Sequence, residues 1–418
     1  MDKIEYPYHL FHKLDKSVTM GLIHDFGLDK NGDADKLVYD IVYDLNHETD
    51  KEELGLKVAM YYDYLLETIK FSDNRIVITY EIDFGESAPM TSFSKLLNQL
   101  GIDEDSFNVN SIIRPDSISE DNSIVYRNAT LDNDAINTID IVYGRSVLYK
   151  RPIPNTKKVK TIQSYEYIWV EIDVTNRMLR FIISDNEKNH IEGKFDGTRT
   201  QIIKEILPEL QSKYVFSVNG DLDERHTLFL LYKHLTSQIE KDYSSKITAE
   251  IKDEIEHLVS DVKIQLSIID KEDIGLCNRI EKIFERNLIK KDFENFVNKQ
   301  VKDGRVLNVG FTDSIGGSVK AASGGKRRFG DKELSFDLQD SDVYFDIKET
   351  IYLVQQLQSI TVSWKNADVL VDDSRFSNIN VTYSAFDGFY VTHFKGIKVR
   401  KEIYNYVLPK FEEFKKRG

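Results

Sequence analysis

The chain has 418 residues and a formal net charge of −14, and 41% of its residues are hydrophobic while 30% are charged. A chain of this length is too long to fold around one compact core of ordinary size. Its content of hydrophobic residues is too high for an intrinsically disordered chain. The chain has no signal-peptide pattern at its start and no run of eighteen apolar residues, so we expect a multidomain cytoplasmic protein. The single cysteine, Cys277, excludes an internal disulfide and a thiolate cluster, and we expect it to be a small buried residue.

The acidic excess is confined to the first third of the chain. Residues 1–150 hold 28 acidic and 14 basic residues, residues 151–300 hold 26 and 24, and residues 301–418 hold 16 and 18. The electrostatic field of such a charge distribution repels nucleic acid from the first third of the chain and permits nucleic-acid binding near the other end. We therefore expect the acidic region to engage a protein partner, unless its charge only aids solubility.

The first region, residues 1–150, combines helical and strand patterns. Apolar residues from Leu54 to Ile69 recur at helical spacing and predict a helix over 51–70. The β-branched run 75–82 predicts a strand. Two prolines in the segment 151–158 favour extended backbone, and they place the first domain boundary there.

The second region, residues 151–300, opens with a predicted β-hairpin over 165–183 and continues as helices. The aromatic residues of its first strand favour a covered core strand, and an exposed base-stacking surface is the alternative. Asp221 and Glu224 have the spacing of a capping box before a helix through Ile239. Further apolar patterns predict helices over 247–262 and from Ile280 towards residue 296, the latter with a kink.

The third region, residues 301–418, returns to strands. The patterns predict strands at 305–311, 333–338, 343–347, 379–383 and 389–394, with a turn at Asp387 and Gly388, and an amphipathic helix at the end. The sequence thus predicts an α+β, multidomain protein in which β-rich N- and C-terminal regions flank a largely helical middle. Histidines show no metal-binding spacing, because His226 and His234 lie two helical turns apart, about 12 Å.

One segment of the third region has the composition of a phosphate-binding loop. Residues 316–328 hold four glycines, two serines and four cations, Lys320, Lys326, Arg327 and Arg328. It does not match a P-loop, because Lys320 occupies the first glycine position and Arg327 the Ser/Thr position. A basic, glycine-rich loop suits contact with the backbone phosphates of DNA or RNA through its four cations, and an ordinary soluble loop is the alternative.

An enzymatic hypothesis rests on acidic residues just downstream. Asp331 or Asp337, followed by Asp346, Ile347 and Lys348 on a predicted strand, imitates the acid and D-x-K spacing of metal-dependent nucleases. In such enzymes carboxylates hold Mg²⁺ and a lysine positions water, so Mg²⁺ is the cofactor that this hypothesis requires. Chance spacing in a chain rich in Asp and Lys is the alternative.

The sequence therefore favours a non-catalytic protein that binds nucleic-acid backbone as part of a larger assembly. Its Ile, Lys, Asn and Asp content suggests a bacterial source, and a defence or mobile-element role is a guess about context. Two other hypotheses stay open, a Mg²⁺-dependent nuclease using Asp337, Asp346 and Lys348, and a protein-interaction subunit that acts through its acidic N-terminal domain.

Overall fold

The computed structural model describes residues 4–71, 74–112, 118, 122–152, 159–184, 189–190, 199–267, 275–292, 303–323, 326–329, 332–335, 338–365, 378–394 and 399–415, and of 326–329 and 332–335 it describes the backbone alone. The fold is mixed α+β, as the sequence predicts. The chain divides into two compact units. Unit 1 comprises residues 1–222 and 387–406, and unit 2 comprises residues 223–386 and 407–418.

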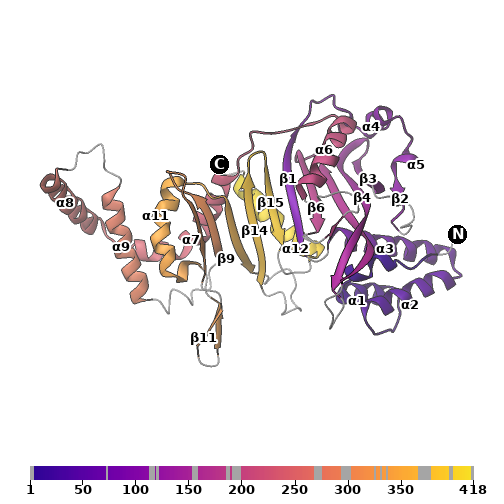
Figure 1. Cartoon of the computed structure of the whole chain (residues 1–418), viewed down its shortest axis with the longest axis horizontal. Coiled ribbons are helices and arrows are strands. Elements are labelled where there is room, and N and C mark those ends of the chain that lie inside the picture. The colour runs from indigo at the N-terminus through magenta and orange to yellow at the C-terminus, as the bar shows by residue number, and fades with distance from the viewer. Residues whose placement is uncertain are drawn as a thin grey trace. The chain divides into compact units, whose positions relative to one another are not determined.

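Unit 1 is built on an antiparallel sheet with the strand order β15-β1-β6-β5-β4-β3-β2 (Figure 1). The bounds of these strands are Phe389–Phe394 for β15, Arg75–Asp83 for β1, Met178–Ser184 for β6, Val159–Asp173 for β5, Ala135–Pro152 for β4, Ser123–Asp132 for β3 and Val109–Asn110 for β2. Two short strands, β7 (Asn189–His190) and β8 (Ser217–Val218), pair with β4 and β1. The predicted strand at 75–82 and the predicted hairpin at 165–183 are confirmed as β1 and the β5–β6 pair.

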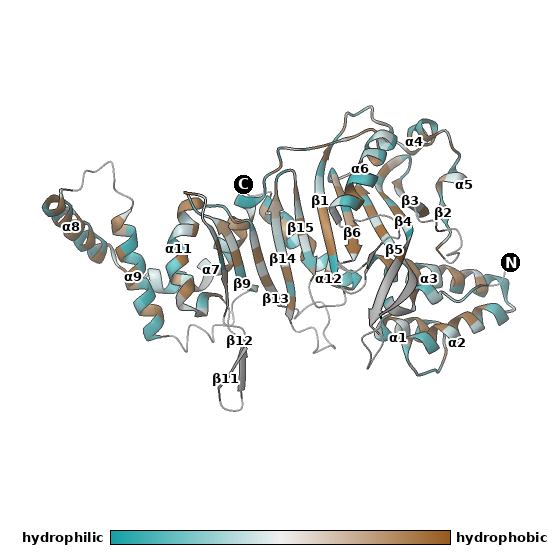
Figure 2. Ribbon diagram, in the orientation of Figure 1, coloured by the Kyte–Doolittle hydropathy of each residue, from teal (hydrophilic) through white to brown (hydrophobic). Residues whose placement is uncertain are grey.

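The helices of unit 1 are α1 (Lys16–Asp25), α2 (Ala34–His47), α3 (Lys51–Lys70), α4 (Phe93–Leu100), α5 (Glu104–Phe107) and α6 (Arg199–Tyr214), with 3-10 turns η1 (Tyr8–Lys13) and η2 (Pro89–Thr91). The predicted helix at 51–70 is confirmed as α3, whose start is capped by the Asp50 carboxylate accepting from two backbone N–H groups. Apolar side chains of α4 and α6 pack on the sheet residues of the main core, and β6 is hydrophobic along most of its length (Figure 2).

A central strand of this sheet is covered on both faces. Tyr167, Ile168, Trp169 and Val170 of β5 are all buried. The core interpretation of these aromatic residues is therefore confirmed over the base-stacking alternative. The strands that flank the proline segment, β4 and β5, pair with each other from Pro152 and Val159 onward, so both lie in unit 1. The boundaries predicted at 150 and 300 stay predictions.

Unit 2 has a smaller antiparallel sheet with the order β10-β9-β13-β14. Its strands are β9 (Gly304–Thr312), β10 (Ser318–Ala322), β13 (Ser359–Lys365) and β14 (Asn378–Phe386), and β11 (Lys326–Phe329) and β12 (Lys332–Ser335) form a separate two-stranded sheet. The helices are α7 (Arg225–Ser244), α8 (Ala249–Leu266), α9 (Leu276–Lys291), α11 (Asp342–Val354) and the 3-10 turn η5 (Leu338–Asp340), and the last helix, α12, spans Lys401–Lys415. Helix α7 packs against β9, β13 and β14.

The turn at Asp387 and Gly388 is confirmed, and Gly388 adopts a positive φ of 83° that favours glycine. The capping box at Asp221 is wrong, because α7 begins later and its N-cap is Glu224, which makes no side-chain cap hydrogen bond. Residues 293–300, where the kinked extension of the third helix is predicted, lie outside the described residues. No helix in the described ranges is both long and apolar enough to cross a bilayer.

Candidate functional site

The four cations of the predicted phosphate-binding loop lie on two strands. Lys320 is exposed on β10, at the end of the strand order of unit 2, where it pairs with Gly310 of β9. Residues 326–328 form β11, which pairs with β12 and not with β10. Gly324 and Gly325 lie outside the described residues. The structure thus separates Lys320 from the other three cations by a change of sheet.

The glycine-rich segment also begins as a tight turn. The Asp313 carboxylate accepts hydrogen bonds from the backbone N–H groups of Ile315 at 3.0 Å and Gly317 at 2.6 Å. Gly316 between them adopts a φ of 90°, which a side chain would strain. A capped turn followed by strands therefore replaces the one continuous loop that the sequence predicts.

The residues of the nuclease hypothesis do not form a D-x-K strand. Residues 343–347 belong to helix α11, so the strand predicted there is wrong. Asp346 and Lys348 are two positions apart, about 200° around a helix, and they face different surroundings. Asp346 is exposed and pairs with Arg286 at 3.0 Å, whereas Lys348 is buried. Asp331 and Asp337 lie outside the described residues, and no group of three His, Cys, Asp or Glu in the described part of the chain could hold a metal ion.

Lys348 instead joins three helices through a buried charge network. Its ammonium group donates to Glu240 of α7 at 2.6 Å and to Glu285 of α9 at 3.2 Å. Each of these three residues is at most 5% exposed. Buried charges are tolerated when they are paired and hydrogen-bonded, as they are here.

Neutral groups complete the hydrogen bonding of Glu240. The amide of Gln339 donates to its Oε1 at 3.1 Å, and the hydroxyl of Tyr344 donates to the same oxygen. Burial and the neighbouring Glu240 charge both raise the pKa of Tyr344 well above its ordinary value, so this hydroxyl keeps its proton and stays a donor. Burial alone would lower the pKa of Lys348, but Glu240 and Glu285 outweigh it and raise that pKa, so the ammonium stays charged.

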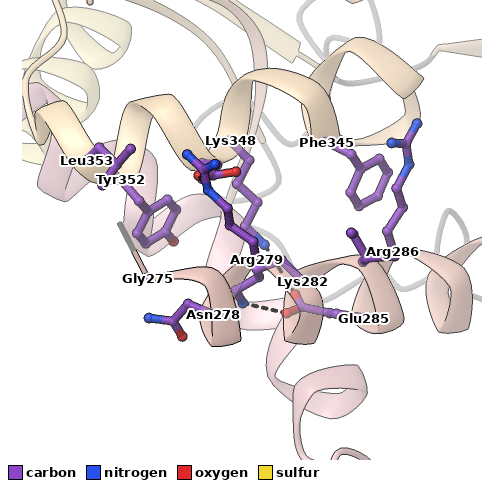
Figure 3. A pocket seen from close by; sticks show the side chains of 12 residues that line it. Gly275, Asn278, Arg279, Lys282, Glu285, Arg286, Phe345, Lys348, Tyr352 and Leu353 are labelled. Carbon is purple, nitrogen blue, oxygen red and sulfur yellow. Dashed lines mark hydrogen bonds and ion pairs between the residues drawn. The ribbon is translucent and has the colours of Figure 1, made fainter. Parts of the chain in front are cut away.

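A cavity of about 640 Å³ lies beside this network, between α9 and α11 (Figure 3). Lys348 and Glu285 line it together with Lys282, whose ammonium also donates to Glu285. Two ion pairs connect the same helices, Arg279 with Glu349 and Arg286 with Asp346. The volume falls within the range of small-molecule sites.

No family model, curated protein or solved structure matches the chain. The chemistry of the site therefore has to come from its own residues. The cavity combines fixed charges with aromatic walls, which suits recognition of a small molecule.

Sequence reasoning named Asp346 and Lys348 but missed their partners Glu240, Glu285 and Arg286. One signal was present. Arg279, Lys282 and Arg286 recur at i, i+3 and i+7, which places three cations on one face of a helix. Asp346 and Glu349 form a matching acidic face, but only if 342–354 is recognised as helical.

Proposed function

We propose that the protein is a non-catalytic, nucleic-acid-binding component of a larger assembly, and that unit 2 contacts the phosphate backbone. One observation carries this proposal. The segment richest in cations, residues 326–328, forms a strand of a two-stranded antiparallel sheet that is separate from the larger sheet. Two-stranded β-ribbons fit the grooves of nucleic acids, and Lys and Arg neutralise their phosphates. Lys320, exposed on β10, adds a fourth cation from a neighbouring part of the chain.

The test compares binding to single- and double-stranded DNA and RNA at several salt concentrations. Replacing residues 326–328 by Glu should weaken binding and make the salt dependence shallower by roughly one unit for each lost phosphate contact. A control with the same charge change replaces Lys36, Lys51 and Lys95, which are exposed in unit 1, by Glu. Identical salt curves for the wild type and the 326–328 variant would refute the proposal.

A second candidate function, recognition of a basic protein surface by the acidic unit 1, is favoured by a group of exposed aromatic side chains. Tyr39 and Tyr43 are half-exposed on α2, one turn apart. Tyr6 stacks on Tyr39 with ring centroids 4.6 Å apart, and His47 stacks on Tyr43 at 4.0 Å. Exposed tyrosines beside carboxylates suit Lys- and Arg-rich partners, because aromatic faces attract cations and interface hot spots are rich in Tyr.

This second function is tested with a Lys- and Arg-rich peptide as the probe. Tyr39→Ser combined with Tyr43→Ser should weaken peptide binding at least tenfold if these rings are hot spots. Val215→Ala, an exposed apolar position directly after α6, is the control and should leave binding unchanged. Equal affinity of the double variant and the wild type would refute this candidate.

The other predictions from the sequence stay at the level of hypotheses. They comprise the cytoplasmic location, the bacterial source, the defence or mobile-element context, and the arrangement of β-rich ends around a helical middle. The Mg²⁺-dependent nuclease gains no support from the described geometry, because Asp346 pairs with Arg286 and Lys348 with two glutamates. Mg²⁺-dependent cleavage that is abolished by Asp346→Ala would restore it.

A further inference from the structure

The cavity between α9 and α11 has more positive than negative side chains on its walls. Arg279, Lys282, Arg286 and Lys348 line it, against the two carboxylates Glu285 and Glu349. The carboxylates that balance the remaining charges, Glu240 and Asp346, do not line the cavity. The charge that a molecule inside the cavity meets first is therefore positive, which favours an anion.

The ion pairs between the two helices can be opened at low cost. The Asp346 side chain is 65% exposed and that of Glu349 is 39% exposed, so water solvates either carboxylate once its partner turns away. Exposed ion pairs of this kind contribute about 0–1 kcal/mol each. The guanidinium group of Arg279 can thus turn from Glu349 to an anionic ligand. Its bidentate donors match phosphate and carboxylate oxygens.

Lys348 supplies a fixed donor at the base of the cavity. Among the residues that the structure describes, its three N–H donors have two carboxylate acceptors, Glu240 and Glu285. The Lys282 ammonium lies next to it on the shared acceptor Glu285, and the side chain of Lys282 is half-exposed (Figure 3). An anion in the cavity can accept from both ammonium groups without breaking the buried network.

The other walls are apolar or aromatic. Phe345 and Tyr352 of α11 lie at opposite ends of the lining (Figure 3), and Ile283 and Leu353 also line the cavity. Ile283 and Leu353 are more than half exposed, so they offer apolar surface to a ligand. The guanidinium of Arg286 lies 5.4 Å from the centre of the Phe345 ring, so a cation and an aromatic face occur at the same end.

We propose that this cavity binds a small organic anion that carries a flat apolar ring, of the class of a nucleoside monophosphate or an aromatic carboxylate. The anionic group lies among Arg279, Lys282 and Lys348, and the ring packs against Phe345 or Tyr352. The site is separate from the cations of β10 and β11, so it is independent of the nucleic-acid proposal. The side chains that line the cavity explain both required parts of the ligand. The three cations account for its negative charge, and the aromatic side chains at the two ends account for its ring.

The experiment measures binding to the full chain by calorimetry with five probes, which are adenosine monophosphate, 2-naphthoate, adenosine, naphthalene-2-methanol and inorganic phosphate. The charged ring compounds should bind at least tenfold more tightly than the uncharged rings or inorganic phosphate. Adenosine monophosphate carries its charge as a phosphate and 2-naphthoate as a carboxylate, so tight binding of either supports the proposal. The proposal is overturned if neither charged ring compound binds. It is also overturned if an uncharged ring compound or inorganic phosphate binds as tightly as the charged ring compounds.

Matched variants locate the binding. Arg279→Gln combined with Lys282→Gln should weaken binding of the charged ring compounds at least tenfold, and Phe345→Leu should weaken it severalfold. Lys290→Gln, an exposed cation on the same helix outside the cavity, should not change it. The variant with Glu at residues 326–328 should also bind normally, which separates this site from the nucleic-acid surface. Unchanged binding in the double variant, with its fold verified by circular dichroism, overturns the proposal even if a probe binds.

Discussion

Lys348→Met is the substitution that tests the buried network most directly. It replaces an ammonium group that lies 2.6 Å from Glu240 and 3.2 Å from Glu285 by an apolar group of similar length. Both glutamates then remain buried, and Glu285 keeps its ion pair with Lys282. Removing one partner of a buried ion pair costs about 3–5 kcal/mol, because the other charge is left uncompensated. We expect the free energy of unfolding of unit 2 to fall by about 4 kcal/mol.

The two tryptophans make this loss measurable in one unit. The chain has two, and Trp169 lies in β5 of unit 1 while Trp364 lies in β13 of unit 2, both buried. In a Trp169→Phe background, fluorescence therefore reports the unfolding of unit 2. A loss of about 4 kcal/mol should lower the urea midpoint by about 2 M, for a slope of about 2 kcal/mol/M.

A triple variant distinguishes lost charge balance from lost packing. Lys348→Met combined with Glu240→Gln and Glu285→Gln removes the uncompensated charges and keeps the side-chain volumes. It should recover at least half of the stability that Lys348→Met loses, because neutral replacements of a buried ion pair are often tolerated. A midpoint shift below about 0.5 M for Lys348→Met, or equal instability of the single and triple variants, would refute the reasoning.

Three further predictions concern the two units. Burial lowers the pKa of His9 to about 4, although a hydrogen bond to the backbone carbonyl of Ile112 acts to raise it. Between pH 6.5 and 4 the unfolded chain therefore binds a proton that folded unit 1 does not, so acidification to pH 4.5 should lower the free energy of unfolding of unit 1 by about 2 kcal/mol. His9→Gln should remove this pH dependence, as measured by Trp169 fluorescence. Arg145→Met should destabilise unit 1 by about 3–5 kcal/mol in urea unfolding, because it leaves the buried Glu166 without the Nε–H donor at 2.8 Å. Gly304→Ala should cost unit 2 about 1–3 kcal/mol, since a Cβ there would lie 2.9 Å from the Trp364 ring, and an unchanged melting temperature would contradict it.

The sequence identified elements whose pattern is local and strong. Helix α3 has a capped start and twenty residues of helical spacing, and β1 has a β-branched run, so both were predictable. Residues 343–347 show the limit of this reasoning. Val343, Phe345 and Ile347 alternate like a strand, but Ser341 caps a helix by accepting from the Tyr344 N–H at 3.3 Å. Tyr344, Lys348 and Ile351 then follow at helical spacing and are buried.

The candidate site was less accessible to sequence reasoning than the fold. Glu240, Glu285 and Lys348 come from three helices that are far apart in the chain, and only tertiary packing brings their charges together. An isolated Glu or Lys in a sequence predicts exposure, because these residues are rarely buried without partners. The basic face of α9 and the acidic face of α11 can each be recognised from residue spacing in the sequence. Their pairing depends on the antiparallel packing of the two helices, which the sequence does not show.

The order in which the units are assembled from the chain has a consequence for synthesis. Strand β1 pairs with β6, with β8 at Ile82 and Asp83, and with β15 from Ile76 to Thr79, but β15 comes only after residues 223–386 have been made. Until then the side of residues 76–79 that faces away from β6 has no strand partner for its backbone N–H and C=O groups, and such edges promote wrong pairing between nascent chains. Ribosome pausing or truncation between residues 222 and 387 should therefore yield an aggregation-prone intermediate, and the completed C-terminal segment closes that edge in the finished protein.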